Sequence, residues 1–139
     1  MIILDTNVLS ELFRPEPDPN VLEWLTVIGE DVATTSITAA ELLAGVRRMS
    51  EGRRKRELGS RITLALDPYM AAGLILPFDY LAAQQYADVL VLRERAGLPI
   101  SAPDAQIAAI CRTHHGICAT RNTKDFAHTG VEILNPWLT

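Results

Sequence analysis

The chain opens with a run of large aliphatic residues, Ile2–Leu4, that stops at a carboxylate, Asp5. A short, continuous aliphatic run is typical of a strand that is buried on both faces, as in a parallel sheet. Thr6 and Asn7 follow at once and can cap a helix. The apolar stripe of that helix would consist of Val8, Leu9, Leu12 and Phe13. Asp5 is therefore expected in a strand-to-helix turn, and ligands of open α/β sheets bind at such carboxyl ends. A plain helix cap is the alternative.

Helical and strand patterns alternate along the rest of the chain. Strands are expected at residues 2–4, 32–35, 74–78, 117–120 and 131–134. Helices are expected to start after Thr6 and Asn7, at Pro19 after the Asp18 cap, near residues 36–38, after Gly52, after the Asp79 cap and at Ser101. In the same order, these six helices should end near residues 13, 29, 49, 65, 96 and 115. The helix that starts after Gly52 has an expected continuation across Pro68 toward residue 72. Asn135 and Pro136 should end the regular structure. This alternation predicts a parallel sheet with helices on its faces.

The 139 residues suffice for one domain with one substantial core, so we expect a single domain over residues 1–139. No apolar run approaches the roughly 20 residues that span a bilayer. Met1 leads straight into a strand, which leaves no room for a signal peptide. We therefore expect a soluble cytoplasmic protein without a membrane partner. Cys111 and Cys118 lack C-x-x-C spacing and are expected to be buried thiols.

The formal net charge of −4 argues at first against a nucleic-acid partner, but the charge is unevenly distributed. Residues 47–61 hold seven of the 13 basic residues and two acids, a local charge of +5, which leaves −9 for the rest. A basic segment beside an acidic remainder is compatible with a phosphate-binding rim around a carboxylate site. A solvated helix face is equally compatible with it. Arg47 and Arg48 are the candidate RNA contacts in this segment.

Three further acids, Glu41, Asp104 and Asp125, fall at positions equivalent to Asp5 near the same predicted sheet edge. Each has a structural explanation. Thr38 with Glu41, and Ser101 with Asp104, match the capping-box pattern, and Asn122 to Asp125 matches a polar turn.

Asp104 and Glu41 lie at places that capping does not require. On a helical wheel, Asp104 is in line with Ile107, Ala108 and Cys111, so its carboxylate is on the face that must turn to the core. Glu41 lies at the margin of the apolar face of its own helix. A carboxylate directed into a core needs a partner.

If the four acids converge, they need a cation. Two carboxylates about 4 Å apart repel by roughly 4 kcal/mol at an effective dielectric near 20, which is large beside a domain stability of about 5–15 kcal/mol. All-oxygen ligands favour Mg²⁺ or Mn²⁺ over zinc. A carboxylate-held metal beside basic residues suits phosphodiester hydrolysis by a metal-activated water. The expected supports of the metal site are Thr6, Asn7, Thr120 and Asn122, and the expected phosphate contacts are Arg14, Arg121 and Lys124.

Four sequence stretches together resemble the PIN-domain ribonucleases. They are Ile-Leu-Asp-Thr-Asn at 3–7, Ala-Glu-Leu-Leu-Ala-Gly at 40–45, Pro-Asp-Ala-Gln-Ile-Ala-Ala at 103–109 and Ala-Thr-Arg-Asn-x-x-Asp-Phe at 119–126. The resemblance spans essentially the whole chain and is narrowest with the VapC toxins of bacterial VapBC toxin–antitoxin pairs, including their FitB-like branch. It implies a PIN-domain-like α/β/α sandwich with a central, mostly parallel five-stranded sheet.

The resemblance also implies roles for single residues. Asp5, Glu41, Asp104 and Asp125 would form the catalytic acidic cluster, with Asp5 and Asp104 as the most direct metal ligands. Thr120 and Asn122 would support them. Some relatives carry a further acid where this chain has Asn122, so the number of metal ions stays open.

The expected activity is that of a Mg²⁺-dependent endoribonuclease toxin. The resemblance further implies a homodimer and a cognate VapB-type antitoxin, whose C-terminal segment would lie in an apolar groove and direct a basic side chain toward the acids. Two alternatives stay open. An aspartate-dependent phosphatase would want a second Asp two residues after Asp5, where this chain has Asn7. A catalytically weak domain would bind nucleic acid or a partner without cutting.

Overall fold

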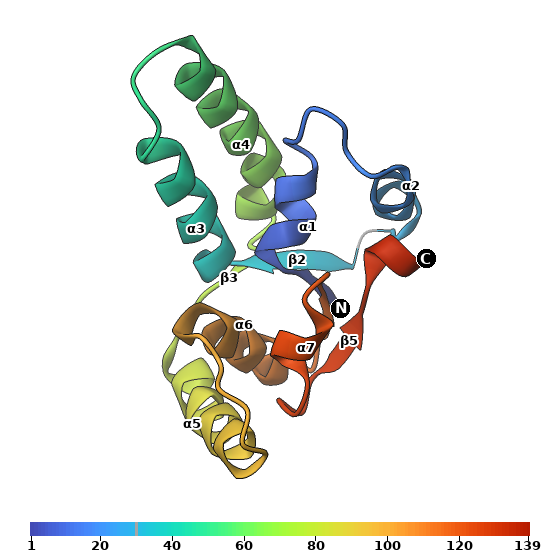
Figure 1. Ribbon diagram of the computed structural model, residues 1–139, viewed down its shortest axis with the longest axis vertical. Helices are drawn as coiled ribbons and strands as arrows, with labels where there is room; N and C mark the ends of the chain where they lie inside the picture. Colours follow the sequence, from blue (N-terminus) through green and yellow to red (C-terminus); the bar gives the residue numbers. More distant parts are fainter. Residues whose placement is uncertain (30) are drawn as a thin grey trace.

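Five short strands form the centre of the computed structural model, which describes residues 1–29 and 31–139 (Figure 1). They are β1 (Ile2–Leu4), β2 (Val32–Thr35), β3 (Ile75–Leu76), β4 (Ile117–Ala119) and β5 (Glu132–Leu134). The strand order is β3-β2-β1-β4-β5, and each neighbouring pair is parallel. The predicted sheet is therefore confirmed, and its described strands are all parallel.

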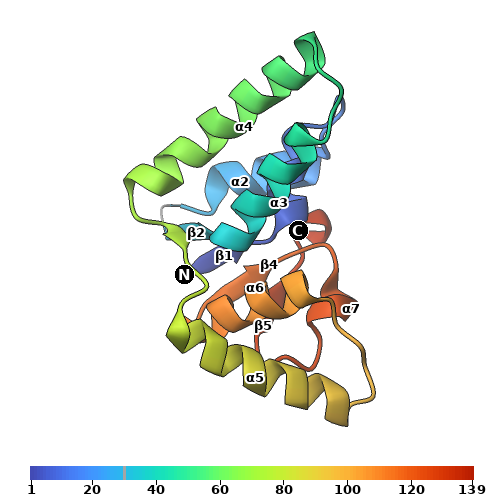
Figure 2. The same cartoon turned by 90° about the vertical axis from the view of Figure 1, so that its left-hand side faces the viewer.

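Helices cover both faces of this sheet (Figures 1 and 2). They are α1 (Thr6–Glu11), α2 (Pro19–Val27), α3 (Ser36–Arg47), α4 (Arg53–Ala71), α5 (Tyr80–Arg95), α6 (Ala102–Thr113) and α7 (Thr123–Phe126), followed by a 3-10 helix, η1 (Pro136–Leu138). The first four helices pack mainly on one face, and α5 and α6 pack on the other. The α/β/α sandwich implied by the resemblance is thus confirmed.

The period-two alternation of the strands explains why the sheet has two apolar faces. In β1, Ile3 belongs to the core under α5 and α6, whereas Leu4 belongs to the core under α1, α2 and α4. In β4, Cys118 and Ala119 divide in the same way. Successive side chains of a strand point to opposite faces, so a continuous aliphatic run supplies both cores at once.

The element boundaries follow local signals in most places. Asp18, Asp79 and Ser101 each accept a hydrogen bond from a backbone amide in the first turn of α2, α5 and α6, as expected. The carboxylate of Asp5 caps α1 through the amide of Thr6, so the expectation that Thr6 or Asn7 caps it is wrong.

Helix α4 continues through Pro68 to Ala71, as expected. Other boundaries differ from the expectation. The third strand is only Ile75–Leu76 because Pro77 has no amide hydrogen to donate. Helix α1 ends at Glu11, two residues early. The polar turn at 122–125 is a short helix, and η1 follows Asn135 where the regular structure was expected to end.

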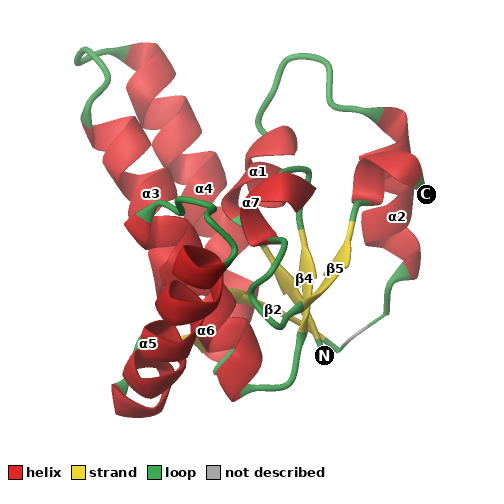
Figure 3. Ribbon diagram, turned by 60° about the horizontal axis from the view of Figure 1, so that its bottom comes forward, coloured by secondary structure: helices red, strands yellow, loops and turns green. Residues whose placement is uncertain are grey.

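The topology brings four segments to the carboxyl edge of the sheet. Strand β1 leads into α1 after one residue, β2 leads directly into α3, and β4 leads into α7 after three residues. Figure 3 shows the ends of β4 and β5 below α1, α7 and α2. Helix α6 precedes β4 and runs back across the sheet, so its N-terminal end lies at the same edge. Strand order reverses at β1, which is where open α/β sheets place their ligands. Within the described chain, none of the helices combines the length and apolarity that a membrane span requires.

Candidate active site

Asp5 is the deepest side chain of the site. It is 3 % exposed at the end of β1, where its backbone amide continues the pairing with β4 by donating to the carbonyl of Ala119. Its Oδ1 accepts a hydrogen bond of 2.8 Å from the amide of Thr6, and its Oδ2 accepts one of 2.8 Å from the hydroxyl of Thr120. Helix capping thus uses Oδ1 of Asp5, and the hydroxyl of Thr120, just after β4, holds Oδ2. Asp5 is more than a plain cap.

Thr120 connects the ends of β1 and β4. Its side chain is fully buried and donates to Asp5, while its hydroxyl oxygen accepts from the amide of Asn122 at 3.0 Å and from Nδ2 of Asn7 at 3.3 Å. Oδ1 of Asn7 in turn accepts from the backbone amide of Arg121 at 3.2 Å. The predicted support residues therefore form one hydrogen-bonded group around Asp5.

Glu41 lies in α3 and faces α1. Its Oε1 accepts a hydrogen bond of 2.7 Å from the hydroxyl of Thr6. The capping-box explanation of Glu41 is wrong, because the cap of α3 is Thr35, whose hydroxyl accepts from the amide of Thr38 at 3.1 Å. Thr38 is buried inside the helix. The position of Glu41 beside Thr6 therefore does not follow from helix capping.

Asp104 lies in the first turn of α6. The hydroxyl of Ser101 accepts from its backbone amide at 3.3 Å, so the serine half of the expected capping box is present. The side chain is half-buried, above the fully buried Ile107 and Ala108, as the helical wheel predicts. Burial raises the pKa of Asp104, and the nearby charges of Asp125 and Glu41 raise it further.

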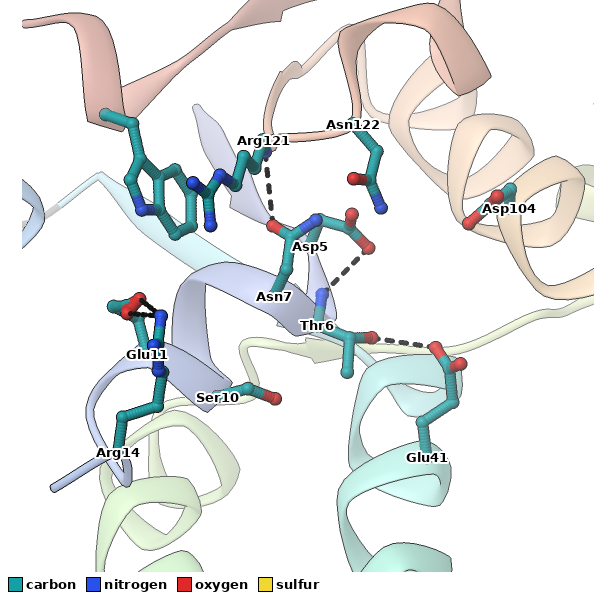
Figure 4. Close-up of a pocket in the computed structure, with 11 residues that line it drawn as sticks. Asp5, Thr6, Asn7, Ser10, Glu11, Arg14, Glu41, Asp104, Arg121 and Asn122 are labelled. Atoms are coloured by element: carbon teal, nitrogen blue, oxygen red, sulfur yellow. Dashed lines mark hydrogen bonds and ion pairs between the residues drawn. The ribbon is translucent and has the colours of Figure 1, made fainter. Parts of the chain in front are cut away.

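The acids Asp5, Glu41 and Asp104 line one cavity of about 340 Å³, into which their carboxylates converge (Figure 4). They come from β1, α3 and α6, three elements that are remote along the chain. Arg14 and Arg121 form part of the same lining. The complete lining is Asp5, Thr6, Asn7, Ser10, Glu11, Arg14, Glu41, Asp104, Arg121, Asn122 and Trp137.

Each arginine of the cavity has a fixed neighbour. The guanidinium of Arg121 lies 5.2 Å from the ring centre of Trp137, a cation–π distance. Nη1 of Arg14 contacts both carboxylate oxygens of Glu11 at 2.9 and 3.3 Å (Figure 4). Glu11 is 2 % exposed, whereas Arg14 is largely exposed. Of the two arginines in the lining, Arg14 is thus paired with an acid and Arg121 has no described acidic partner.

Five predicted residues do not line this cavity. Thr120 is one of them, because it is fully buried and reaches the site only through its hydrogen bond to Asp5. Asp125 is exposed on α7, although its charge is close enough to raise the pKa of Asp104. Lys124 is its exposed neighbour. Arg47 and Arg48 lie at the C-terminal end of α3, whose N-terminal end faces the site, so the structure does not place the basic segment around the acids (Figure 1).

The sequence reasoning missed three lining residues, Ser10, Glu11 and Trp137. The first two could have been found, because Asn7, Ser10, Glu11 and Arg14 form a polar stripe opposite the apolar stripe of α1. Trp137 carries no local signal. It reaches the cavity only because β5 pairs with β4 and η1 follows.

The donor set suits a hard divalent cation. Burial raises the pKa of Asp5 from its ordinary 3.8 to about 6, the hydrogen bonds from Thr120 and Thr6 oppose this, and the charges of Asp104 and Glu41 add to it. No described ion pair neutralises any of these three acids. Carboxylate oxygens are the ligands that Mg²⁺ and Mn²⁺ prefer. Across residues 1–29 and 31–139, however, no three Asp, Glu, His or Cys side chains form a preassembled metal cage.

Comparison with known proteins agrees with this architecture. The family model for the PIN domain matches residues 2–132. The toxin FitB of Neisseria gonorrhoeae is 42 % identical over 138 residues, 99 % of each chain. The VapC ribonuclease Y4jK of Sinorhizobium fredii is 40 % identical over 138 residues, 99 % of this chain and 98 % of that one. In the crystal structure of FitAcB from Neisseria gonorrhoeae, a chain with 41 % identity superposes with a TM-score of 0.93 over the full length of both. The chain described here belongs to the PIN domain family.

Proposed function

We propose that this chain is a metal-dependent endoribonuclease that acts as the toxin of a toxin–antitoxin pair. The observation that carries the proposal is the convergence of Asp5, Glu41 and Asp104 on one cavity that also has two arginines in its lining. Such an arrangement suits an anionic substrate that is cut beside a divalent cation. The names of the relatives, a toxin and a VapC ribonuclease, support the same activity.

Asp5 and Asp104 are the residues that would hold Mg²⁺ or Mn²⁺, with Glu41 and Asp125 adding negative charge. When bound, the cation lowers the pKa of a coordinated water and offsets the charge of the phosphate. The protein's own part is orientation. Thr120 and the Thr6 amide fix both oxygens of Asp5, so its rotamer is set before any ligand arrives.

Arg121 and Arg14 would bind the phosphates on either side of the scissile bond. The ring of Trp137 holds the Arg121 guanidinium at the cavity, which reduces the side-chain entropy lost on binding. Arg14 is paired with Glu11 and exposed, so a phosphate can share its remaining donors. Lys124, Arg47 and Arg48 would contact only more distant parts of an RNA.

An antitoxin partner is supported by a second, more apolar cavity that adjoins the first. It has a volume of about 350 Å³, lies between α1, α3 and α4, and shares Thr6, Ser10, Arg14 and Glu41 with the acidic cavity. Its remaining lining is Phe13, Leu42, Gly45, Val46, Leu58 and Ile62. A VapB-type segment lying in this groove would reach the acids directly. The similar solved structures include FitAB bound to a DNA fragment, at 40 % identity and a TM-score of 0.92.

We also propose a homodimer that acts in the cytoplasm as a single PIN domain. Large apolar side chains are exposed on both sides of the edge strand β3: Leu64 and Met70 on α4, and Tyr80 and Leu81 on α5. In this proposal these exposed apolar side chains would contact the second protomer. Light scattering at micromolar concentration tests the stoichiometry.

The phosphatase alternative has no support in the geometry. A phosphatase would need a general acid at position 7, but both polar ends of the Asn7 side chain are used, by Thr120 and by the Arg121 amide. The family assignment also argues against it.

The decisive experiment is cleavage of a single-stranded RNA with Mg²⁺, Mn²⁺ or EDTA, by the wild type, Asp104→Asn and the exposed control Asp88→Asn. We expect the wild type and the control to cut only with a divalent ion. Asp104→Asn should lose about 10²-fold or more of the rate, since it removes a proposed ligand. Cleavage in EDTA, or by Asp104→Asn at the wild-type rate, would remove the metal mechanism. RNA binding without cleavage would favour the non-catalytic alternative.

A further inference from the structure

A buried arginine lies behind the acidic cavity without an acidic partner. Arg93, in the last turn of α5, is 3 % exposed. The described ion pairs do not include it. Charged side chains are almost never fully buried unless they are paired, because the lost hydration must be replaced. Arg93 therefore calls for an explanation beyond ordinary core packing.

Backbone carbonyls replace the missing carboxylate. Nε of Arg93 donates to Leu98 at 3.2 Å, and Nη2 donates to Pro99 at 2.7 Å. Nη1 donates to Lys124 at 3.1 Å and to Ala127 at 2.7 Å. The first two carbonyls belong to the loop between α5 and α6, and the other two lie in and just after α7. One guanidinium thus ties together two segments that are about 25 residues apart in the sequence. Figure 2 shows α7 beside the loop that joins α5 and α6.

Both segments carry acids of the candidate site. The loop from Leu98 leads into Ser101, the cap of α6, and so into Asp104. Lys124 immediately precedes Asp125. The charge of Arg93 also acts on Asp104. Burial and the neighbouring acids raise the pKa of Asp104, whereas the positive charge of Arg93 lowers it. The four hydrogen bonds of Arg93 therefore link the two backbone segments that lead to Asp104 and Asp125. They also hold a positive charge between these segments and the core.

We propose that Arg93 is a positioning residue of the acidic site, which sets Asp104 relative to Asp125 and supplies a permanent counter-charge behind them. This proposal rests on the proposed nuclease function. Arg93 itself is buried behind the cavity and contacts neither RNA nor the metal. Its effect passes through the two backbone segments that it holds.

The chemistry of the side chain explains why this position is an arginine. A guanidinium has five N–H donors in a rigid plane, and the contacts to two separate segments need its wide fork. A lysine keeps the charge but has its donors on one nitrogen, so it cannot reach both segments at once. Arg93→Lys therefore keeps the positive charge but loses the hydrogen bonds that join the two segments. Arg93→Gln removes the charge and keeps some of the hydrogen-bond donors.

The test compares the wild type, Arg93→Lys, Arg93→Gln and Arg95→Met, a control at an exposed arginine two residues further along α5. Circular dichroism first gives a temperature at which each protein is folded. Mn²⁺ alone is then titrated by thermal unfolding, and kcat and KM for RNA cleavage are measured at that temperature. We expect both Arg93 variants to need roughly 10–100-fold more Mn²⁺ for the same stabilisation, with a lower kcat and an unchanged KM. The control should match the wild type.

Each other outcome is decisive. If the wild type binds Mn²⁺ and cuts RNA, and a folded Arg93→Lys does so equally well, only the positioning proposal is overturned. If neither Arg93 variant folds at any temperature, Arg93 is a folding residue and the proposal is again overturned. If the wild type and the control neither bind Mn²⁺ nor cut RNA, the proposed function fails together with the inference that rests on it.

Discussion

Replacing Asp5 with asparagine is expected to abolish metal-dependent cleavage and yet to stabilise the metal-free protein at neutral pH. Burial raises the pKa of Asp5 from 3.8 to about 6. The folded protein therefore keeps this proton to a higher pH than the unfolded chain does. The free energy of unfolding should fall as the pH rises from about 4 to about 6, and this contribution is constant above that range. Above pH 6 the folded protein holds an unfavourable charge that Asp5→Asn removes.

The magnitude follows from the pKa shift and from one hydrogen bond. A shift from 3.8 to about 6 corresponds to about 3 kcal/mol at roughly 1.36 kcal/mol per unit. This shift already includes the hydrogen bond from Thr120 to the charged carboxylate. Asparagine can still accept from the Thr6 amide, but its Nδ2 cannot accept from the Thr120 hydroxyl as a neutral carboxyl can, which costs about 1 kcal/mol. The net gain should be about 1–2 kcal/mol. For a chain of this length that raises Tm by about 3–8 °C.

Thermal unfolding in EDTA at about pH 4 and about pH 7.5 tests this reasoning. The control is Asp67→Asn, an exposed acid on α4 away from the cavity. We expect the stabilisation by Asp5→Asn at the higher pH only, because at pH 4 the Asp5 carboxyl of the folded wild type is already neutral. A variant that is less stable than the wild type at pH 7.5, or whose Tm difference is the same at both values, would refute the argument.

Two further outcomes follow from other contacts. Trp137→Ala should raise KM for RNA about 2- to 5-fold with little change in kcat, because an exposed cation–π contact is worth about 0.5–1 kcal/mol. Steady-state kinetics test this. If the ring orients Arg121, KM should rise less in Trp137→Phe than in Trp137→Ala, and equal KM values for the two variants would contradict the prediction. Pro68→Ala should raise the free energy of unfolding by up to about 3 kcal/mol in urea, since it restores an amide hydrogen inside α4, and an unchanged midpoint would contradict this.

The acids of the cavity could be anticipated because their positions depend on local signals. Asp5 directly follows a strand, Glu41 lies in the second turn of the helix after a strand, and Asp104 lies one turn after a serine cap. Parallel strands bring all such positions to one edge of a sheet, so no knowledge of long-range contacts was needed. The apolar surroundings of Asp104 were visible from the spacing of Ile107 and Ala108 alone.

The basic segment shows where such reasoning fails. Charge density along the chain does not say which end of a helix faces the site. Arg47 is six residues beyond Glu41 in α3, which is about 9 Å further along the axis at 1.5 Å per residue. The charges of the turn and of α4 are partly used in local pairs, such as Arg53 with Glu57 and Lys55 with Glu51. The arginines of the cavity come from elsewhere.

Trp137 and Arg93 could not be identified for a different reason. Their roles depend on contacts between segments far apart in sequence, and neither residue type announces such a contact. Trp137 follows a strand whose place at the sheet edge is set by its pairing with β4. Arg93 lies on a helix where an arginine ordinarily faces solvent, and only the packing of α7 against the α5–α6 loop encloses it.

Arg93 and Asp104 belong to one electrostatic arrangement, since the charge of Arg93 lowers the pKa of Asp104. Asp5, Glu41 and Asp104 repel one another in a cavity without a neutralising ion pair in the described chain, so their charge has to be balanced through space. Arg93 contributes a permanent positive charge from the protein side, and its carbonyl partners prevent it from moving forward to neutralise the acids by direct contact. The carboxylate oxygens thus remain free on the cavity side. Arg93 thus offsets part of the negative charge of the site without occupying the carboxylate oxygens. The site keeps its affinity for a divalent cation, which a direct ion pair between Arg93 and an acid would abolish.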